Sequence, residues 1–264
     1  MKVRILSIGD WKPADVVARW VEDRRPRIPE VEEIIERSWR EAQNRPGIHL
    51  FDGPVCRLEC FRAGEKLELD LSRTSYKIAW GTNLNNASLA DRFGAGALAN
   101  GVGLSCALES ADGYLMLGKR NAAVAFYPRR VHPFAGTLEP TQNLDVFAEA
   151  RRELSEELGF TDSDISRMSC VGIVEDAALR QPEMVFAVKS ARTRGEIEQM
   201  LDVTEHESCR TIAPSTQEVA RTLVEPILTP GAVGATLLWG LRQFGRAWFD
   251  EAQRAVNLGD HEPE

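Results

Sequence analysis

Long apolar runs and an excess of basic charge are both missing from this sequence of 264 residues. No stretch approaches the roughly 18 uninterrupted apolar residues that a membrane-spanning helix needs. Lysine and arginine number 32 against 40 aspartates and glutamates, so the net charge is −8. An acidic chain of this kind lacks the electrostatic footprint of a general nucleic-acid binder. We therefore expect neither a membrane span nor a nucleic-acid partner.

Cysteine is scarce, and its spacing argues against a zinc site. The five cysteines form no C-x-x-C pair, and Cys56 and Cys60 lie four residues apart in a predicted strand. This spacing suits thiols that face a core rather than metal ligands. The first residues also lack the apolar core and the cleavage site of a signal peptide. We expect thiols packed in the core and a cytoplasmic location.

The first hundred residues and the remainder differ in their hydrophobic pattern. The apolar spacing predicts helices over 13–23 and 30–44. In the segment 55–72 apolar residues alternate at Leu67, Leu69 and Leu71, and Ala63-Gly64 near its middle predicts a hairpin. A stretch rich in glycine, alanine and asparagine, 94–101, marks a soft boundary. We expect an N-terminal α/β region at 1–100 and a second domain at 101–264.

Strands and helices alternate after this boundary. Strands are predicted at 101–110, 114–120, 130–136, 168–174, 183–190 and 208–213, and helices at 144–158, 193–202, 215–224 and 232–256. Mixed strands interleaved with helices give an α/β or α+β sandwich.

The helix that begins near Leu144 has two distinct faces. At about 100° per residue, its apolar residues share one arc and Glu149, Glu153, Glu156 and Glu157 share another. Carboxylates that lie so close together repel one another unless a cation neutralises them. Clusters with oxygen ligands alone select Mg²⁺ or Mn²⁺. The alternative is a solvated acidic helix face whose charge is partly offset by neighbouring arginines.

The flanks of this helix favour the metal interpretation. A predicted strand ends at Gly136, a loop follows, and the helix contains R-E-L-S-E-E-L-G-F from Arg152 to Phe160. This arrangement resembles the Nudix box, G-x5-E-x7-R-E-U-x-E-E-x-G-U, in which U is a bulky aliphatic residue. The second half matches without a gap. In the first half the loop is two residues longer, and Leu144 replaces the first glutamate, for which Asp145 or Glu149 is a substitute.

The resemblance implies a fold and a chemistry. The fold is a Nudix α/β/α sandwich with a mixed sheet at 101–264, preceded by the N-terminal α/β extension. Glu153, Glu156 and Glu157 are then ligands of Mg²⁺, with Mn²⁺ as the alternative, and Arg152 braces the junction of loop and helix. Such metals neutralise a diphosphate and lower the pKa of bound water.

Further motifs resemble the animal Nudix enzymes that hydrolyse UDP-glucose and UDP-galactose. They are Leu71 to Asn83 with its G-T-N ending, Phe51-Asp52-Gly53-Pro54, Gly101-Val102-Gly103, Glu139-Pro140 and His206-Glu207-Ser208. This resemblance implies cleavage of a UDP-sugar to UMP and a sugar 1-phosphate. It places Tyr76, Thr82 and Asn83 in the cleft wall, reading uracil or sugar, or else in a structural turn.

Several single residues complete the expected site. Glu207 is expected as a further ligand or base, and Glu183 is either a second such group or a charge on an edge strand. The predicted catalytic residues are Arg152, Glu153, Glu157 and Glu207, the metal ligands are Glu153, Glu156, Glu157 and Glu207, and the substrate-binding residues are Tyr76, Thr82, Asn83, Arg120, Arg130 and Gly136. Alternatives are another nucleoside diphosphate derivative such as ADP-ribose, or a binding module with weak catalysis. The partner is a small-molecule nucleotide, and the oligomeric state stays open.

Overall fold

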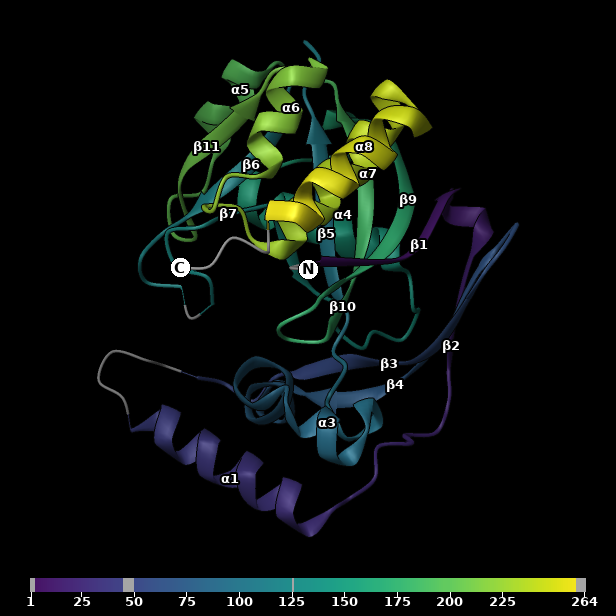
Figure 1. Cartoon of the computed structure of the whole chain (residues 1–264), viewed down its shortest axis with the longest axis vertical. Helices are drawn as coiled ribbons and strands as arrows, with labels where there is room; N and C mark the ends of the chain where they lie inside the picture. Colours follow the sequence, from purple (N-terminus) through teal and green to yellow (C-terminus); the bar gives the residue numbers. More distant parts are fainter. Residues whose placement is uncertain (1–2, 45–49, 125, 260–264) are drawn as a thin grey trace.

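A mixed sheet of eight strands forms the larger part of the molecule (Figure 1). The computed structural model describes residues 3–44, 50–124 and 126–259. The strand order is β1-β9-β10-β5-β6-β11, with β8 paired to β5 and β7 paired to β6. Only β10 and β5 run parallel among these pairs. The strands are β1 (Val3–Trp11), β5 (Gly103–Glu109), β6 (Leu115–Arg120), β7 (Val131–His132), β8 (Phe134–Thr137), β9 (Ile165–Asp176), β10 (Gln181–Ser190) and β11 (His206–Ile212).

Helices cover both faces of this sheet. On one face, α4 (Val146–Leu158) and α5 (Arg194–Met200) pack against a core that includes Phe147, Leu154 and Phe186. On the other face, α6 (Thr216–Leu223), α7 (Pro230–Phe244) and α8 (Arg246–Gly259) enclose a second core around Trp239. The predicted α/β/α sandwich with a mixed sheet is therefore confirmed.

The carboxylate-bearing helix α4 has well-defined ends. The Asp145 side chain accepts hydrogen bonds from the backbone N–H groups of Phe147 and Ala148, which satisfies donors at the helix start. Gly159 follows the last turn with φ 64°, a left-handed conformation that favours glycine. Asp145 is thus a helix cap, and this capping role occupies the carboxylate that was considered as a substitute for the missing box glutamate.

A second, three-stranded sheet lies beside the first in the order β2-β4-β3 (Figure 1). Strands β3 (Pro54–Ala63) and β4 (Leu67–Ser75) form the predicted hairpin. Leu67, Leu69 and Leu71 on β4 belong to the same core cluster as Phe147 on α4, so the two parts share one apolar interior. The other elements here are β2 (Val16–Trp20), α1 (Pro29–Gln43), α2 (Tyr76–Ala79), a π-helical turn (Trp80–Leu84) and α3 (Leu89–Phe93), with single 3₁₀ turns at Pro13–Asp15 and Ala95–Ala97. A further 3₁₀ turn, Asp162–Asp164, lies between α4 and β9.

Strand β1 precedes the smaller sheet in sequence yet pairs with β9 at the edge of the larger one. The division of the chain at residue 100 stays a prediction. The first eleven residues, although they belong to the predicted N-terminal region, contribute β1 to the larger sheet. The chain then crosses to the smaller sheet and forms β2.

Two predicted helices are wrong in detail. Residues 16–20, expected inside a helix, form β2 and pair in parallel with β4. Alternate side chains of this V-V-A-R-W segment are more exposed, which is a two-residue period rather than a helical one. The predicted helix 232–256 is two helices, because Gly245 adopts φ 84° between α7 and α8. Gly240 lets the second helix fold back, since a Cβ there would lie 2.1 Å from the Trp248 ring.

A buried arginine ties the segment between the two parts to the small sheet. Arg57 on β3 donates hydrogen bonds to the carbonyl oxygens of Gly96 and Leu98 and to the carboxylate of Glu59. Glu59 also accepts from the Ser72 hydroxyl. Because Arg57 is 2% exposed, losing one of these acceptors would leave a buried charge unpaired. The connecting segment is therefore held in one conformation.

The expectation of core-packed thiols holds for three of the five cysteines, whereas Cys60 and Cys209 are partly exposed. All five cysteines are free, and Cys56, Cys106 and Cys170 are buried in the core. Burial raises the pKa of the Cys170 thiol to about 12, so this group stays protonated. In the described part of the chain, no helix combines the length and apolarity that crossing a membrane would require.

Candidate active site

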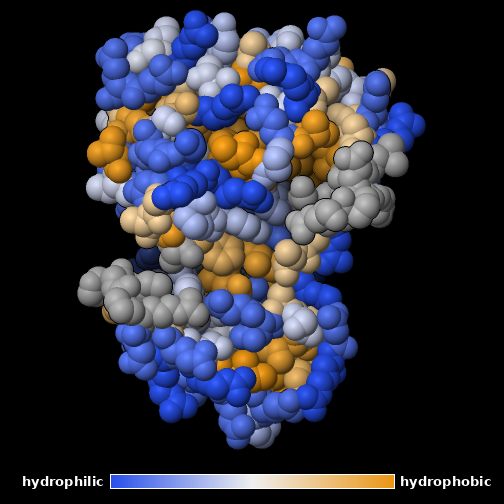
Figure 2. Space-filling view, turned by 60° about the vertical axis from the view of Figure 1, so that its left-hand side comes forward, coloured by the Kyte–Doolittle hydropathy of each residue, from blue (hydrophilic) through white to orange (hydrophobic). Residues whose placement is uncertain are grey.

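A cavity of about 570 Å³ opens between the two parts of the molecule. This volume is within the range of small-molecule sites. Figure 2 shows apolar surface in the hollow between the two lobes, and the apolar lining includes Phe51, Leu84 and Phe126. The predicted site residues that line the cavity are Tyr76, Arg120, Gly136, Arg152, Glu153 and Glu156, together with Glu183.

Gly136 and Glu153 interlock at one end of the cavity. A Cβ at Gly136 would lie about 2 Å from the Glu153 carboxylate, so any larger residue on β8 would displace this side chain. The glycine of the box motif therefore has a steric function. It lets a carboxylate of α4 lie directly against the strand that the loop connects to this helix.

Arg152 is surrounded by carboxylates. Its guanidinium donates to Glu149, Glu153 and Glu156 at 3.0, 2.6 and 2.8 Å. Glu149 is 7% exposed and has this arginine as its charged partner. Of the two proposed substitutes for the missing box glutamate, Glu149 is therefore the one that pairs with the box arginine. Arg152 holds three carboxylates of α4 together, and its role at the junction of loop and helix stays a prediction.

Glu157 lies deeper and is oriented by two donors. Its Oε2 accepts from the backbone N–H of Ala135 at 3.0 Å, and its Oε1 lies 3.1 Å from Nε2 of the fully buried His206. A histidine that donates its Nε2–H in this way fixes the direction of a carboxylate. His206 is thus a hydrogen-bond donor to Glu157.

The carboxylates of this end are poised for a cation. Burial and the neighbouring Glu157 and Glu156 raise the pKa of Glu153 to about 7, although Arg152 lowers it. Burial also raises the pKa of Glu157. The negative charges therefore cost free energy here unless a cation joins them. Carboxylate oxygens of Glu157 and Glu205 lie within 4.8 Å of each other, beside the His206 ring. An oxygen-rich set of this kind fits Mg²⁺ or Mn²⁺.

Glu205, not Glu207, joins this group. Glu205 lines the cavity, whereas the Glu207 carboxylate forms an ion pair with Lys119 at 2.5 Å and both side chains are well exposed. The pairing of β11 with β6 shifts register between His206 and Ser208, so residue 207 lies in an irregular strand. Alternation along a strand alone does not reveal this irregularity, and it separates two glutamates that flank the same histidine.

Arg120 and Arg130 separate in a similar way. Arg120 ends β6 and lines the cavity, and its Nε has no hydrogen-bond partner among the described residues. Arg130 lies in the loop before β7, outside the cavity lining. Of the two predicted arginines, Arg120 is the one that lines the cavity.

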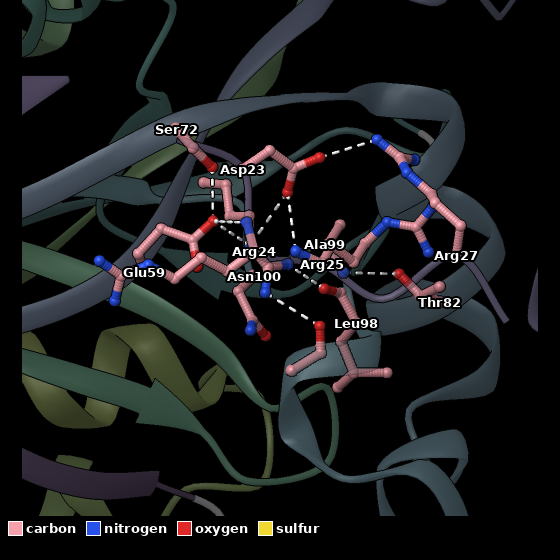
Figure 3. A network of polar contacts seen from close by, with 12 residues as sticks. Asp23, Arg24, Arg25, Arg27, Glu59, Ser72, Thr82, Leu98, Ala99 and Asn100 are labelled. Atoms are coloured by element: carbon pink, nitrogen blue, oxygen red, sulfur yellow. Dashed lines mark hydrogen bonds and ion pairs between the residues drawn. The ribbon is translucent and has the colours of Figure 1, made fainter. Parts of the chain in front are cut away.

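Thr82 and Asn83 are buried and hold the cavity wall. The Thr82 hydroxyl accepts from the Ala99 N–H (Figure 3). The Asn83 amide donates to the carbonyls of Leu179 and Arg180 at 3.0 and 3.1 Å and accepts from the Asn100 N–H. Every polar group of Asn83 is engaged, and only Tyr76 of the three predicted residues lines the cavity.

The turn that Asn83 holds belongs to the opposite wall of the cavity. Asp176 accepts hydrogen bonds from the backbone N–H groups of Ala178 and Leu179, and from the hydroxyl of Tyr127 at 2.6 Å. Asp176, Tyr127 and Leu179 line the cavity. The β9–β10 turn is therefore fixed from inside by Asp176 and from outside by Asn83.

Glu183 and His132 also line the cavity. Since β10 lies between β9 and β5, the interpretation of Glu183 as an edge-strand charge is wrong. Sequence reasoning missed His132, Asp176 and Glu205. Of these, Glu205 carried a signal, because it stands beside His206 in E-H-E-S.

Comparison with protein-family models and with curated proteins finds no match. Among solved structures, the chain is similar to DR0079 from Deinococcus radiodurans, with 16% identity, a TM-score of 0.41, and coverage of 55% of this chain and 83% of that one. It is also similar to a MutT protein from Methanosarcina mazei Go1, with 13% identity, a TM-score of 0.33, and coverage of 61% and 95%. A third similar structure is Tm1382, named as a candidate Nudix hydrolase, with 10% identity, a TM-score of 0.35, and coverage of 53% of this chain and 71% of that one. At TM-scores below 0.5 these likenesses carry no conclusion about function, and the site is interpreted from its own geometry.

Proposed function

We propose that the chain is a divalent-metal-dependent hydrolase of the Nudix type, which cleaves the diphosphate of a nucleoside diphosphate derivative in the cytoplasm. The observation that carries this proposal is the contact between Gly136 and Glu153 inside a cavity. It joins the glycine and the glutamate of the Nudix-like motif at the place where a substrate enters. An ordinary solvated acidic helix face requires no such contact.

The residues divide the work at this end of the cavity. Glu153, Glu156, Glu157 and Glu205 would hold Mg²⁺ or Mn²⁺, and such a cation supplies charge neutralisation and acidified water for attack at phosphorus. Arg152 keeps the carboxylates of α4 together. Arg120 contributes a positive charge to the cavity, where it can meet a phosphate oxygen.

The preferred substrate in this proposal is a nucleoside diphosphate sugar of the UDP-glucose or UDP-galactose type, giving UMP and a sugar 1-phosphate. Support comes from the sequence motifs described above and from Tyr76, an aromatic side chain in the cavity wall that offers a stacking face. ADP-ribose is the second candidate, because the same carboxylates would serve any diphosphate.

A substrate panel tests both levels. Product release from UDP-glucose, UDP-galactose, ADP-ribose and dinucleoside polyphosphates is measured with Mg²⁺ and with Mn²⁺, and again with excess chelator. We expect turnover of UDP-sugars that disappears with the chelator. Turnover of ADP-ribose alone would overturn the proposed UDP-sugar substrate and would still support a metal-dependent diphosphate hydrolase. Absence of turnover of every compound with either metal would contradict the hydrolase proposal.

A further inference from the structure

A second polar group lies in the same cavity, on the opposite face of the large sheet from α4. Glu183 pairs with Gly103 in the parallel β10–β5 register, and a Cβ at Gly103 would lie 3.1 Å from Cγ of Glu183. The Ser105 hydroxyl donates to Oε1 of Glu183. The side chain thus faces the first turn of α7, whereas Glu153 lies against Gly136 on the α4 side.

Glu183 and His132 converge on Gly231, in the first turn of α7. A Cβ at Gly231 would lie 2.7 and 2.9 Å from the two carboxylate oxygens of Glu183, and 3.1 Å from Cε1 of His132. His132 shares a hydrogen bond of 2.7 Å between its Nδ1 and the hydroxyl of Thr229, which leaves Nε2 as the ring nitrogen open to a ligand. The missing side chain at residue 231 keeps this corner of the cavity open.

Burial disfavours the charged form of both groups. Burial and the nearby Asp176 raise the pKa of Glu183 to about 8. Burial, with the positive charge of Arg120 and the proximity of His206, lowers the pKa of His132 to about 3. A protonated carboxyl offers a donor and an acceptor, and the neutral imidazole, whose Nδ1 is paired with Thr229, offers one further polar contact through Nε2. This corner therefore suits an uncharged polar group, whereas the α4 end suits an anion with its metals.

We propose that Glu183 and His132 form a recognition subsite for an uncharged group with adjacent hydrogen-bond donors and acceptors, carried by the substrate beyond its diphosphate. The chemistry fits the imide edge of a pyrimidine and equally the neighbouring hydroxyls of a sugar. This inference rests on the proposed function, because the diphosphate must bind at the α4 end for another part of the substrate to reach Gly231. A site that pairs such groups disfavours compounds lacking them.

Three variants test the subsite. Glu183→Met keeps the size and removes the hydrogen bonds, so kcat/KM for UDP-glucose should fall about 10- to 100-fold, mainly through KM. Glu183→Gln offers an amide donor and a carbonyl acceptor in place of the protonated carboxyl, and should stay within about threefold of the wild type. Gly231→Ala fills the corner from a different element and should raise KM in the same way. Lys189→Met, on the exposed far end of β10, is the matched control.

Two pairs of compounds identify the group that is recognised. UDP-glucose and CDP-glucose differ in the hydrogen-bonding edge of the base. UDP-glucose and UDP-galactose differ in the orientation of one sugar hydroxyl. Glu183→Met should change the kcat/KM ratio of one pair and leave that of the other unchanged. The inference is overturned if Glu183→Met keeps kcat/KM and both ratios, or if Glu183→Gln loses as much as Glu183→Met.

Binding separates this inference from the proposed function. If the wild type hydrolyses none of these compounds, the proposed function fails, and titration calorimetry with UMP and with glucose 1-phosphate then decides the subsite. Weaker binding of one product by Glu183→Met, but not by Glu183→Gln, supports it. Equal binding of both products by all three proteins overturns it.

Discussion

The two ends of the cavity use glutamate in opposite ways. On the α4 side, Glu153 and Glu156 share Arg152, and Glu157 is held by His206, so carboxylates are concentrated where a cation would join them. At the α7 side, Glu183 stands with Ser105 and a neutral His132, and its pKa of about 8 keeps it protonated. The comparison teaches that the environment decides whether a buried glutamate is a ligand of cations or a neutral hydrogen-bonding group.

The largest effect is expected from removing one charge at the α4 end. Glu157→Gln keeps the volume, and we expect kcat to fall by at least about 10²-fold. Because the amide has one acceptor oxygen for the two donors Ala135 and His206, the free energy of unfolding should fall by about 1–3 kcal/mol. The measurement is steady-state turnover of UDP-glucose with saturating Mg²⁺. Glu198→Gln, the same substitution on exposed α5, is the control. An unchanged rate in Glu157→Gln would remove the contrast between the two ends.

A smaller effect should separate the two glutamates that flank His206. Glu205→Gln removes a member of the ligand group, so the affinity for Mn²⁺ should fall at least about tenfold. Glu207→Gln removes a partner of Lys119 at the surface and should change the affinity less. Mn²⁺ titration of both variants by calorimetry gives the order. The reverse order would restore Glu207 as the ligand that the sequence motif implies.

Asn83 should affect the wall between the two ends rather than either chemistry. Asn83→Ala leaves the partly buried carbonyls of Leu179 and Arg180 without their donor, at a cost of about 1–3 kcal/mol in the free energy of unfolding. Hydrogen exchange in the 176–181 turn should become faster, and KM should rise more than kcat falls. Asn85→Ala removes a hydrogen bond to the Trp80 carbonyl beside the π-helical turn that contains Asn83, and this variant is the local control. Unaltered hydrogen exchange in 176–181 would contradict the role of Asn83 in holding this turn.

The remaining effect concerns the pH dependence of stability, measured in the presence of chelator. A pKa of about 8 in the folded state lies above the ordinary value of 4.5, so the folded protein binds more protons than the unfolded chain between these values. Stability attributable to Glu183 therefore decreases as pH rises from about 4.5 to about 8. Glu183→Gln should remove this decrease. The drop in Tm between pH 5 and pH 8 should therefore be smaller in this variant than in the wild type. Identical pH profiles would mean that Glu183 is ionised in the fold.

Much of the architecture followed from local pattern. The hairpin around Ala63-Gly64, the helix with its glutamates and the alternation of strands with helices after residue 101 were predictable from periodicity and turn residues. The helix expected at 13–23 was wrong because β2 obtains its conformation from pairing with β4. The single helix at 232–256 was wrong because helical spacing continues across Gly245, where only the backbone angle ends α7.

The candidate site was predictable in part for a similar reason. The spacing of Glu153, Glu156 and Glu157 on one helix is a local property, so the sequence determined that these carboxylates share a face. Thr82 and Asn83 were expected to read the substrate, yet they hold backbone groups of distant segments. A polar side chain that completes a buried hydrogen-bond network and one that faces a ligand have the same appearance in a sequence.

By itself, then, the sequence determined the class of fold, the carboxylate helix and the glycine that the Nudix-like motif places before it. Only the tertiary structure decided that Glu205 joins Glu157 while Glu207 does not, and that Glu183 meets His132 at Gly231. The physical reason is that helical periodicity is set within a few residues by the backbone. The pKa of a carboxyl, in contrast, depends on burial and on charges that segments far apart in the chain bring to it.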